Sequence, residues 1–278
     1  MTLGRVLVVA GSDSGGGAGI QADIKTVMAL GGYAQTAVTA LTAQDTHGVR
    51  AVVTVDADFV RLQMRMAFAD IGVDAVKTGM LGDLATIDAV GDVLDERAGS
   101  APVVVDPVMT AKGGANLLQS AAVSGLRGRL FGHATLLTPN LPEAEVLTGI
   151  AIVDEAAMHA AIDALLAEGL AGVLLKGGHL HGPEVVDILA TRLGREVFRA
   201  PRIETRHTHG TGCTLASAVA TGLAQGMALR EAVLRARHYV LAAIAAAPGL
   251  GGGHGPLGHG EASKQSLFEK KDQKTSQC

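Results

Sequence analysis

The chain has 278 residues, of which 48% are hydrophobic and only 3% aromatic, and its formal net charge is −4. The negative charge argues against nucleic acid or an anionic membrane as the main partner, since both attract basic proteins. The length fits one large α/β domain or two small ones. With so few aromatic residues, the core must consist of Val, Leu, Ile and Ala, as in buried parallel strands.

Two cysteines, Cys213 and Cys278, are too few for a disulfide framework, so we expect a reducing, cytoplasmic setting. The first apolar run, residues 6–10, is too short to be a signal peptide. The Ala-rich run at residues 240–250 is interrupted by Pro248, so we expect no membrane-spanning segment.

Short apolar runs alternate with segments of helical periodicity along most of the chain. This alternation predicts an α/β fold, with a mainly parallel central sheet and helices on both faces. The expected strands cover residues 6–10, 73–77, 102–106, 134–138 and 172–176, and helical spacing is clearest at 20–28 and 59–71. Ligands of such sheets bind beyond the carboxyl ends of the strands. The residues expected at those ends are Gly11, Met80, Asp106, Asn140 and Lys176.

Three segments depart from this alternation. Residues 34–44 and 50–55 are β-rich and predict an edge hairpin or a small β flap, and residues 184–190 and 196–200 predict a late antiparallel pair. From residue 249 the chain becomes Gly/His-rich and then polar. We therefore expect one domain over residues 1–248 and a flexible tail over 249–278. His254 and His259 could bind a metal, but two histidines in a mobile segment usually do not.

The first glycine-rich loop, residues 11–19, follows a strand and opens a helix. It lacks the Gly-Lys-Ser/Thr of a P-loop, and its glycines do not match the dinucleotide fingerprint. Two interpretations stay open, a ligand contact or a closely packed strand-to-helix turn. Asp23 in the following helix either faces the site or lies on a solvated face next to Lys25.

A second glycine-rich turn, residues 208–213, precedes a helical stretch of small residues. Gly210 and Gly212 permit a tight turn whose N–H groups point at one spot, which suits a phosphoryl group. Cys213 lies in the first helical turn, where we expect the helix dipole to lower its thiol pKa. The alternative is a simple turn beside a buried cysteine.

Further polar residues follow three of the strands. Asp106 ends one strand, and Asn140 with Glu143 can face one pocket and help to bind Mg²⁺, although the same pair also suits a helix cap. Lys176 ends another strand and could neutralise nucleotide phosphates, or it could form a salt bridge at a turn. Together, these parts predict phosphoryl transfer, which depends on positioning and charge stabilisation.

Five motifs in this order resemble the hydroxymethylpyrimidine/phosphomethylpyrimidine kinases of thiamine biosynthesis, of the ribokinase-like superfamily. The motifs cover residues 10–23, 77–81, 106–109, 138–144 and 208–213. The resemblance extends from about residue 5 to 248. It implies a ribokinase-like fold, a cytoplasmic homodimer, and ATP-dependent phosphorylation of 4-amino-5-hydroxymethyl-2-methylpyrimidine and then of its monophosphate.

The resemblance also implies roles for individual residues. Cys213 takes the place of an Asp base of many ribokinase-like enzymes, and we expect it to deprotonate or orient the substrate hydroxyl. Gln44 matches the position that reads the pyrimidine, and its amide can both donate and accept hydrogen bonds. The remaining expected residues are Gly210, Thr211 and Gly212 for the transferring phosphoryl group, Gly11, Asp23, Met80 and Val108 beside the ring, Lys176, Asn140 and Thr208 for ATP, and Asp106 and Glu143 for Mg²⁺.

Three other functions remain to be weighed. A pyridoxal/pyridoxine kinase on the same fold is the main alternative, and Gln44 favours the pyrimidine. A thiazole kinase shares a similar Gly-Thr-Gly-Cys turn, but fits the glycine-rich loop less well. A non-catalytic pyrimidine-binding protein would show a damaged phosphoryl site, whereas Gly210, Gly212 and Cys213 are all in place.

Overall fold

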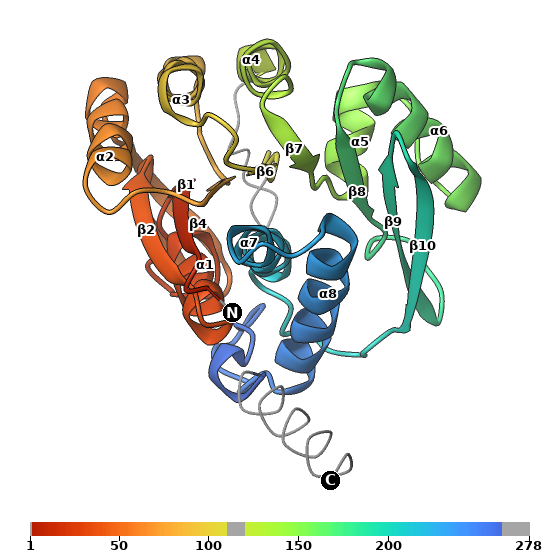
Figure 1. Ribbon diagram of the computed structural model, residues 1–278. Helices are drawn as coiled ribbons and strands as arrows, with labels where there is room; N and C mark the ends of the chain where they lie inside the picture. Colours follow the sequence, from red (N-terminus) through yellow and green to blue (C-terminus); the bar gives the residue numbers. More distant parts are fainter. Residues whose placement is uncertain (1, 110–119, 263–278) are drawn as a thin grey trace, which may run out of the picture.

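The computed structural model describes residues 2–109 and 120–262. A central sheet of eight strands forms its middle layer (Figure 1). The strand order across the sheet is β10-β9-β8-β7-β6-β5-β1-β2. Six neighbouring strands in this order pair in parallel, namely β8, β7, β6, β5, β1 and β2. Strand β9 pairs antiparallel with both β8 and β10. The strands are β1 (Arg5–Ala10), β2 (Tyr33–Val38), β5 (Ala75–Thr78), β6 (Val103–Val105), β7 (Ala134–Leu137), β8 (Gly172–Lys176), β9 (Glu184–Thr191) and β10 (Gly194–Pro201).

Helices cover both faces of this sheet, as the sequence predicts. Helices α2 to α6 pack on one face, and α1, α7 and α8 pack on the other (Figure 1). Their bounds are α1 (Gly19–Ala29), α2 (Ala57–Ala69), α3 (Leu84–Arg97), α4 (Ser120–Leu130), α5 (Leu141–Thr148), α6 (Glu155–Ala167), α7 (Thr211–Ala224) and α8 (Leu229–Ala245). Among these helices, none is both long and apolar enough to cross a membrane.

The central strands are apolar throughout because both of their sides are covered. In β1, Leu7 and Val9 belong to the core under α2 to α6, while Val6 and Val8 belong to the core under α1, α7 and α8. Alternate side chains of one strand therefore fill two cores, which is the usual pattern of a sheet covered on both faces. The strand predictions are confirmed to within one or two residues.

The flap is a separate two-stranded sheet made of β3 (Ala40–Asp45) and β4 (Gly48–Thr54). The predicted β-rich segment at 34–44 therefore divides into two parts. Its first part forms β2 in the main sheet, parallel to β1, and only its second part forms the hairpin. The Asp45 carboxylate closes the hairpin turn by accepting the backbone N–H groups of His47 and Gly48. Gln44 is thereby carried on the flap, next to the main sheet.

The segment after α8 corrects the predicted boundary at residue 248. Residues 249–262 pack on the domain, and Leu257, His259 and Ala262 are buried. Gly258 N–H donates to the Ala243 carbonyl oxygen at 2.8 Å, which fixes this segment to α8. The glycine-rich composition suggested a flexible segment. In the structure, these glycines instead permit close backbone contact with the domain. The expected flexibility of residues 263–278 concerns a part of the chain outside the described residues.

This C-terminal segment also joins the flap to the turn before α7. The backbone N–H of His254 donates to the carbonyl oxygen of Thr46 in the flap turn, at 2.8 Å. The backbone N–H of His209 donates to the carbonyl oxygen of Gly255 at 3.1 Å. His259 Nε2 lies 2.9 Å from Thr214 Oγ1, in the first turn of α7. The segment therefore contributes to the position of two elements of the candidate site.

We expect Leu257→Ala to lower the free energy of unfolding by about 2–5 kcal/mol, as for other large-to-small changes in a core. Leu257 is 4% exposed, whereas Leu250 in the same segment is 60% exposed. Leu250→Ala is therefore the matched control, and its expected effect is within about 0.5 kcal/mol. Urea unfolding of both variants measures the difference. Equal, small effects would show that the segment does not pack on the domain.

Candidate active site

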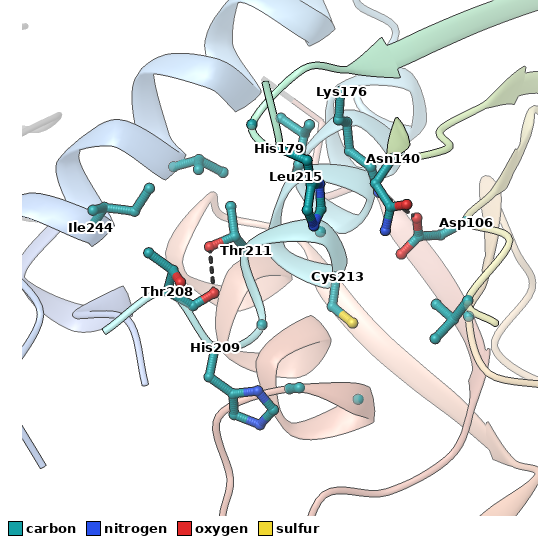
Figure 2. A pocket seen from close by; sticks show the side chains of 18 of the residues that line it. Asp106, Asn140, Lys176, His179, Thr208, His209, Thr211, Cys213, Leu215 and Ile244 are labelled. Carbon is teal, nitrogen blue, oxygen red and sulfur yellow. Dashed lines mark hydrogen bonds and ion pairs between the residues drawn. The ribbon is translucent and has the colours of Figure 1, made fainter. Parts of the chain in front are cut away.

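A cavity of about 720 Å³ opens at the carboxyl ends of the parallel strands. Apart from Asp23, every site residue predicted from the sequence lines this cavity. In Figure 2, Ile244 lies at one end, Asp106 at the other, and Thr211 and Cys213 between them. The predicted grouping of residues that follow separate strands is therefore observed as one site.

The floor of the cavity is formed where the two glycine-rich turns meet. Gly210 has a φ of +83° and caps α7 without any side-chain hydrogen bond. A Cβ on Gly210 would overlap the carbonyl oxygen of Gly17 in the other loop. Glycine is thus required at residue 210 both by its dihedral angle and by the close backbone contact. The first N–H groups of α7, including those of Gly212 and Cys213, have no acceptor within the helix and suit an anion.

The glycine-rich loop after β1 wraps around its own carboxylate. Asp13 accepts backbone N–H groups of Gly15, Gly17 and Ala18 at 2.8, 2.9 and 2.8 Å. Burial alone would raise the pKa of Asp13, but hydrogen bonds from His209 and from these N–H groups outweigh burial and lower it. The interpretation as a closely packed turn is therefore correct, and the loop still lines the cavity through Gly11 and Gly19.

Lys176 lines the cavity and is paired with Asp106. Its Nζ is 2.9 Å from Asp106 Oδ1, and the Thr138 hydroxyl donates to the same oxygen at 3.0 Å. Burial favours the neutral carboxyl group, but Lys176 and Lys77 lower the pKa of Asp106 below its usual value. A Cβ added to Gly212 would lie 3.1 Å from Lys176 Nζ. The lysine is therefore close to the first turn of α7, in addition to forming the predicted salt bridge.

Asn140 and Glu143 form a reciprocal cap at the start of α5. Asn140 Oδ1 accepts the backbone N–H of Glu143 at 2.9 Å, and Glu143 Oε2 accepts that of Asn140 at 2.8 Å. Burial, together with the nearby Asp106, raises the pKa of Glu143 to about 7. The capping interpretation is confirmed, and both side chains nevertheless line the cavity.

Asp23 departs from the sequence prediction. It is fully buried behind the cavity, where both of its oxygens lie 3.0 Å from Lys77 Nζ and one accepts the Ser217 hydroxyl at 2.6 Å. Neither a substrate contact nor a solvated face beside Lys25 describes this position. Asp23 instead holds Lys77, which does line the cavity. Despite burial, the negative charges of Asp23 and Asp106 raise the pKa of Lys77, so its ammonium group stays charged.

The prediction of a lowered pKa for Cys213 is wrong. Burial raises the pKa of this thiol to about 11, and the positive charge of Lys77 offsets only part of that effect. The partial removal of this thiol from water therefore outweighs the helix dipole, although Cys213 lies in the first turn, where that dipole acts. At neutral pH the side chain lines the cavity as a protonated thiol.

The end of the cavity near α8 is largely apolar and was not predicted. Val240, Leu241 and Ile244 line it together with Leu215 of α7. Arg237 forms a buried ion pair with Asp187 and lies 5.2 Å from the ring centre of Phe198. An apolar wall beside a fixed ion pair suits a flat heterocycle such as a nucleotide base. Thr208 lies between this end and α7, and its carbonyl oxygen accepts the Thr211 hydroxyl at 2.8 Å.

Asp13, Lys77 and His209 also line the cavity and were not selected from the sequence. Lys77 carried a usable signal, since a lysine near the end of an apolar strand needs a buried partner. Asp13 and His209 lie inside the two glycine-rich motifs, where roles were assigned to other residues. His209 Nε2 lies 2.9 Å from Asp13 Oδ2, and Gln44 Nε2 lies 3.2 Å from the same ring nitrogen.

Comparison with known proteins identifies the family of this chain. A sequence model described as Phosphomethylpyrimidine kinase matches residues 13–258. The chain belongs to the phosphomethylpyrimidine kinase family. The match extends past residue 248, in agreement with the packed C-terminal segment.

Members and structural neighbours of this family are similar over most of the chain. A hydroxymethylpyrimidine/phosphomethylpyrimidine kinase of Streptomyces coelicolor is 51% identical, over 92% of this chain and 94% of that protein. The thiamine biosynthesis bifunctional protein ThiED of Geobacter sulfurreducens is 56% identical over 92% of this chain, which spans only 52% of that relative. The pyridoxal kinase of Staphylococcus aureus, solved with AMP-PCP and pyridoxal, is 32% identical with a TM-score of 0.86, covering 94% of this chain and 95% of that one.

The raised pKa of Cys213 predicts slow alkylation by iodoacetamide near neutral pH. In a Cys278→Ser background, the rate should rise about tenfold per pH unit between pH 7 and 10 without a plateau, because only the thiolate reacts. A short cysteine peptide, with a pKa of about 8.5, is the control and should level off above pH 9. A plateau for Cys213 near pH 8 would contradict the effect of burial.

Proposed function

We propose that this protein is an ATP-dependent kinase that phosphorylates 4-amino-5-hydroxymethyl-2-methylpyrimidine and then converts the monophosphate to the diphosphate, in thiamine biosynthesis. One observation carries the proposal. Gln44, the uncapped start of α7 and Lys176 line a single cavity. A side chain that can recognise an aminopyrimidine thus shares one site with groups that stabilise a phosphoryl group during transfer.

The cavity offers a place for each part of the reaction. The apolar end beside Ile244 accepts the adenine ring, and Lys176 lies where it can neutralise the nucleotide phosphates. The substrate hydroxyl oxygen attacks the terminal phosphorus, the bond to the bridging oxygen breaks, ADP leaves, and the hydroxyl proton passes to an oxygen of the transferred phosphoryl group. The N–H groups of Gly212 and Cys213 stabilise the charge of the transferring group, and one such donor is typically worth about 3 kcal/mol.

Cys213 orients the first substrate through its thiol. Since the thiol is protonated at neutral pH, it is poorly suited to act as a strong base before the reaction. Phosphoryl transfer requires little deprotonation of the nucleophile before the transition state. The sulfur accepts the hydroxyl hydrogen bond and points the oxygen at the phosphorus. The phosphate nucleophile of the second step is already ionised and needs this help less.

Asp106 and Glu143 are the residues that would hold Mg²⁺. Mg²⁺ is usually bound by one or two carboxylates together with substrate phosphates and water, and both carboxylates line the cavity near Lys176. The bound ion would neutralise phosphate charge. Asn140 supports Glu143 through the reciprocal cap at the start of α5.

A pyridoxal kinase is the second candidate, since the Staphylococcus aureus pyridoxal kinase has nearly the same fold. Gly11 and Met80 present an apolar contact that suits either ring, so discrimination depends on Gln44. Homodimer formation and a cytoplasmic location also stay predictions. Light scattering would contradict the dimer by giving the mass of one chain, and fractionation would test the location.

Mass spectrometry of the products tests the proposal, with MgATP and either the hydroxymethylpyrimidine or pyridoxal. We expect the pyrimidine to gain one phosphate and then a second. Cys213→Ser should slow the first step more than the second, for the reason given above. Phosphate on pyridoxal alone would make the protein a pyridoxal kinase, and equal losses in both steps would remove the proposed role of Cys213.

A further inference from the structure

His209 links the flap to the glycine-rich loop through one ring nitrogen. Its Nε2 lies 2.9 Å from Asp13 Oδ2 and 3.2 Å from the carboxamide nitrogen of Gln44, Nε2. His209 is 8% exposed and Asp13 is 2% exposed, so water does not easily replace either contact. The proton on this nitrogen therefore decides which hydrogen bonds can form.

Asp13 determines whether Nε2 of His209 carries a hydrogen. Its Oδ1 accepts Gly15 N–H and its Oδ2 accepts the N–H groups of Gly17 and Ala18, an environment that favours an ionised carboxylate. An ionised carboxylate can only accept hydrogen bonds. Nε2 of His209 must therefore carry a hydrogen, which it donates to Asp13.

The same hydrogen determines how Gln44 is oriented. A group 3.2 Å from an N–H donor should be an acceptor, whereas the NH₂ end of Gln44 occupies this position in the structure. The two ends of a carboxamide have almost the same shape, and the surrounding hydrogen bonds decide between them. Reversing the amide turns Oε1 toward His209, where it shares the Nε2 hydrogen with Asp13.

Thr42 favours the reversed amide independently. Its hydroxyl lies 2.9 Å from the Ser12 carbonyl oxygen and 3.4 Å from Gln44 Oε1. The single hydroxyl hydrogen goes to the closer Ser12 oxygen, so the hydroxyl can only accept from Gln44. Reversal places the NH₂ group next to that acceptor and resolves both conflicts.

The backbone of Gln44 is already fixed. Its N–H donates to Ser14 Oγ at 2.8 Å, and Ser14 Oγ donates to the Gln44 carbonyl oxygen at 2.8 Å. The orientation of the side-chain carboxamide is then the remaining freedom of Gln44, and His209 and Thr42 determine it.

We propose that His209, held by Asp13, is a positioning residue that sets the orientation of the Gln44 carboxamide and thereby the selectivity of the site for an aminopyrimidine. With one N–H donated to Thr42 and one lone pair turned to His209, Gln44 presents one N–H and one lone pair to the cavity. An amino group beside a ring nitrogen offers the complementary donor and acceptor, and the pyridoxal ring has no such edge. This inference rests on the proposed function.

A double-mutant cycle tests the proposal with four proteins: the wild type, His209→Leu, Gln44→Ala and the double variant. His209→Leu should raise the KM for the hydroxymethylpyrimidine about tenfold, the usual cost of one misdirected hydrogen bond. The KM values for ATP and pyridoxal should change by less than about twofold. The double variant should have the same pyrimidine KM as Gln44→Ala, because the effect of His209 on pyrimidine binding passes through Gln44.

His209→Gln is the conservative control, since its side-chain NH₂ can donate near the place of Nε2. It should recover most of the pyrimidine KM, and it keeps the test meaningful if His209→Leu folds poorly. Two independent KM increases that multiply in the double variant, or an equal rise for ATP, would overturn the proposal while leaving the proposed function intact. A wild type that phosphorylates no pyrimidine would overturn both.

Discussion

The close contact between two backbone turns is the constraint on which the site depends. The loop after β1 and the turn before α7 approach so closely that a side chain at residue 210 would overlap the carbonyl oxygen of Gly17. This contact brings the first strand and the seventh helix to one point, although they are far apart in the sequence. Asp13 then ties the loop to His209, and His209 reaches the flap through Gln44. The phosphoryl site and the substrate-reading side chain thus share one rigid support.

Buried ion pairs prepare the same site electrostatically. Removing two charges from water costs several kcal/mol per ion, and their attraction often only repays that cost. Lys77 with Asp23 and Lys176 with Asp106 are therefore weak contributors to stability. Their benefit is positional, since two ammonium groups are held at the cavity wall before any phosphate arrives. Preorganised charges of this kind do not have to be rearranged during the reaction.

The sequence allowed the sheet and most of the site to be predicted, because the signals are local. Apolar runs such as residues 6–10 identify buried strands, and the parallel arrangement places Asp106, Asn140 and Lys176 at one edge. The position of Asp23 could not be predicted, since helical spacing does not say which of two faces meets a buried lysine. The pKa of Cys213 depends on its burial, which no local pattern reports.

Other features depend on partners that are distant along the chain. The Gly/His-rich composition of residues 249–262 predicts a loose segment, but its contacts with Thr46, Thr214 and Ala243 make it part of the domain. Arg237 and Asp187 likewise meet only in the folded protein, 50 residues apart on α8 and β9. Such pairs have no spacing rule, and only the tertiary structure reveals them.

A crystal structure with the hydroxymethylpyrimidine and a non-hydrolysable ATP analogue would test the central claim most directly. The account predicts that the terminal phosphate lies between Lys176 and the N–H groups of Gly212 and Cys213. The pyrimidine should lie between Gln44 and Met80, with its hydroxyl beside the Cys213 thiol. A phosphate bound instead within residues 15–19, or a pyrimidine bound at the Ile244 end, would contradict the account.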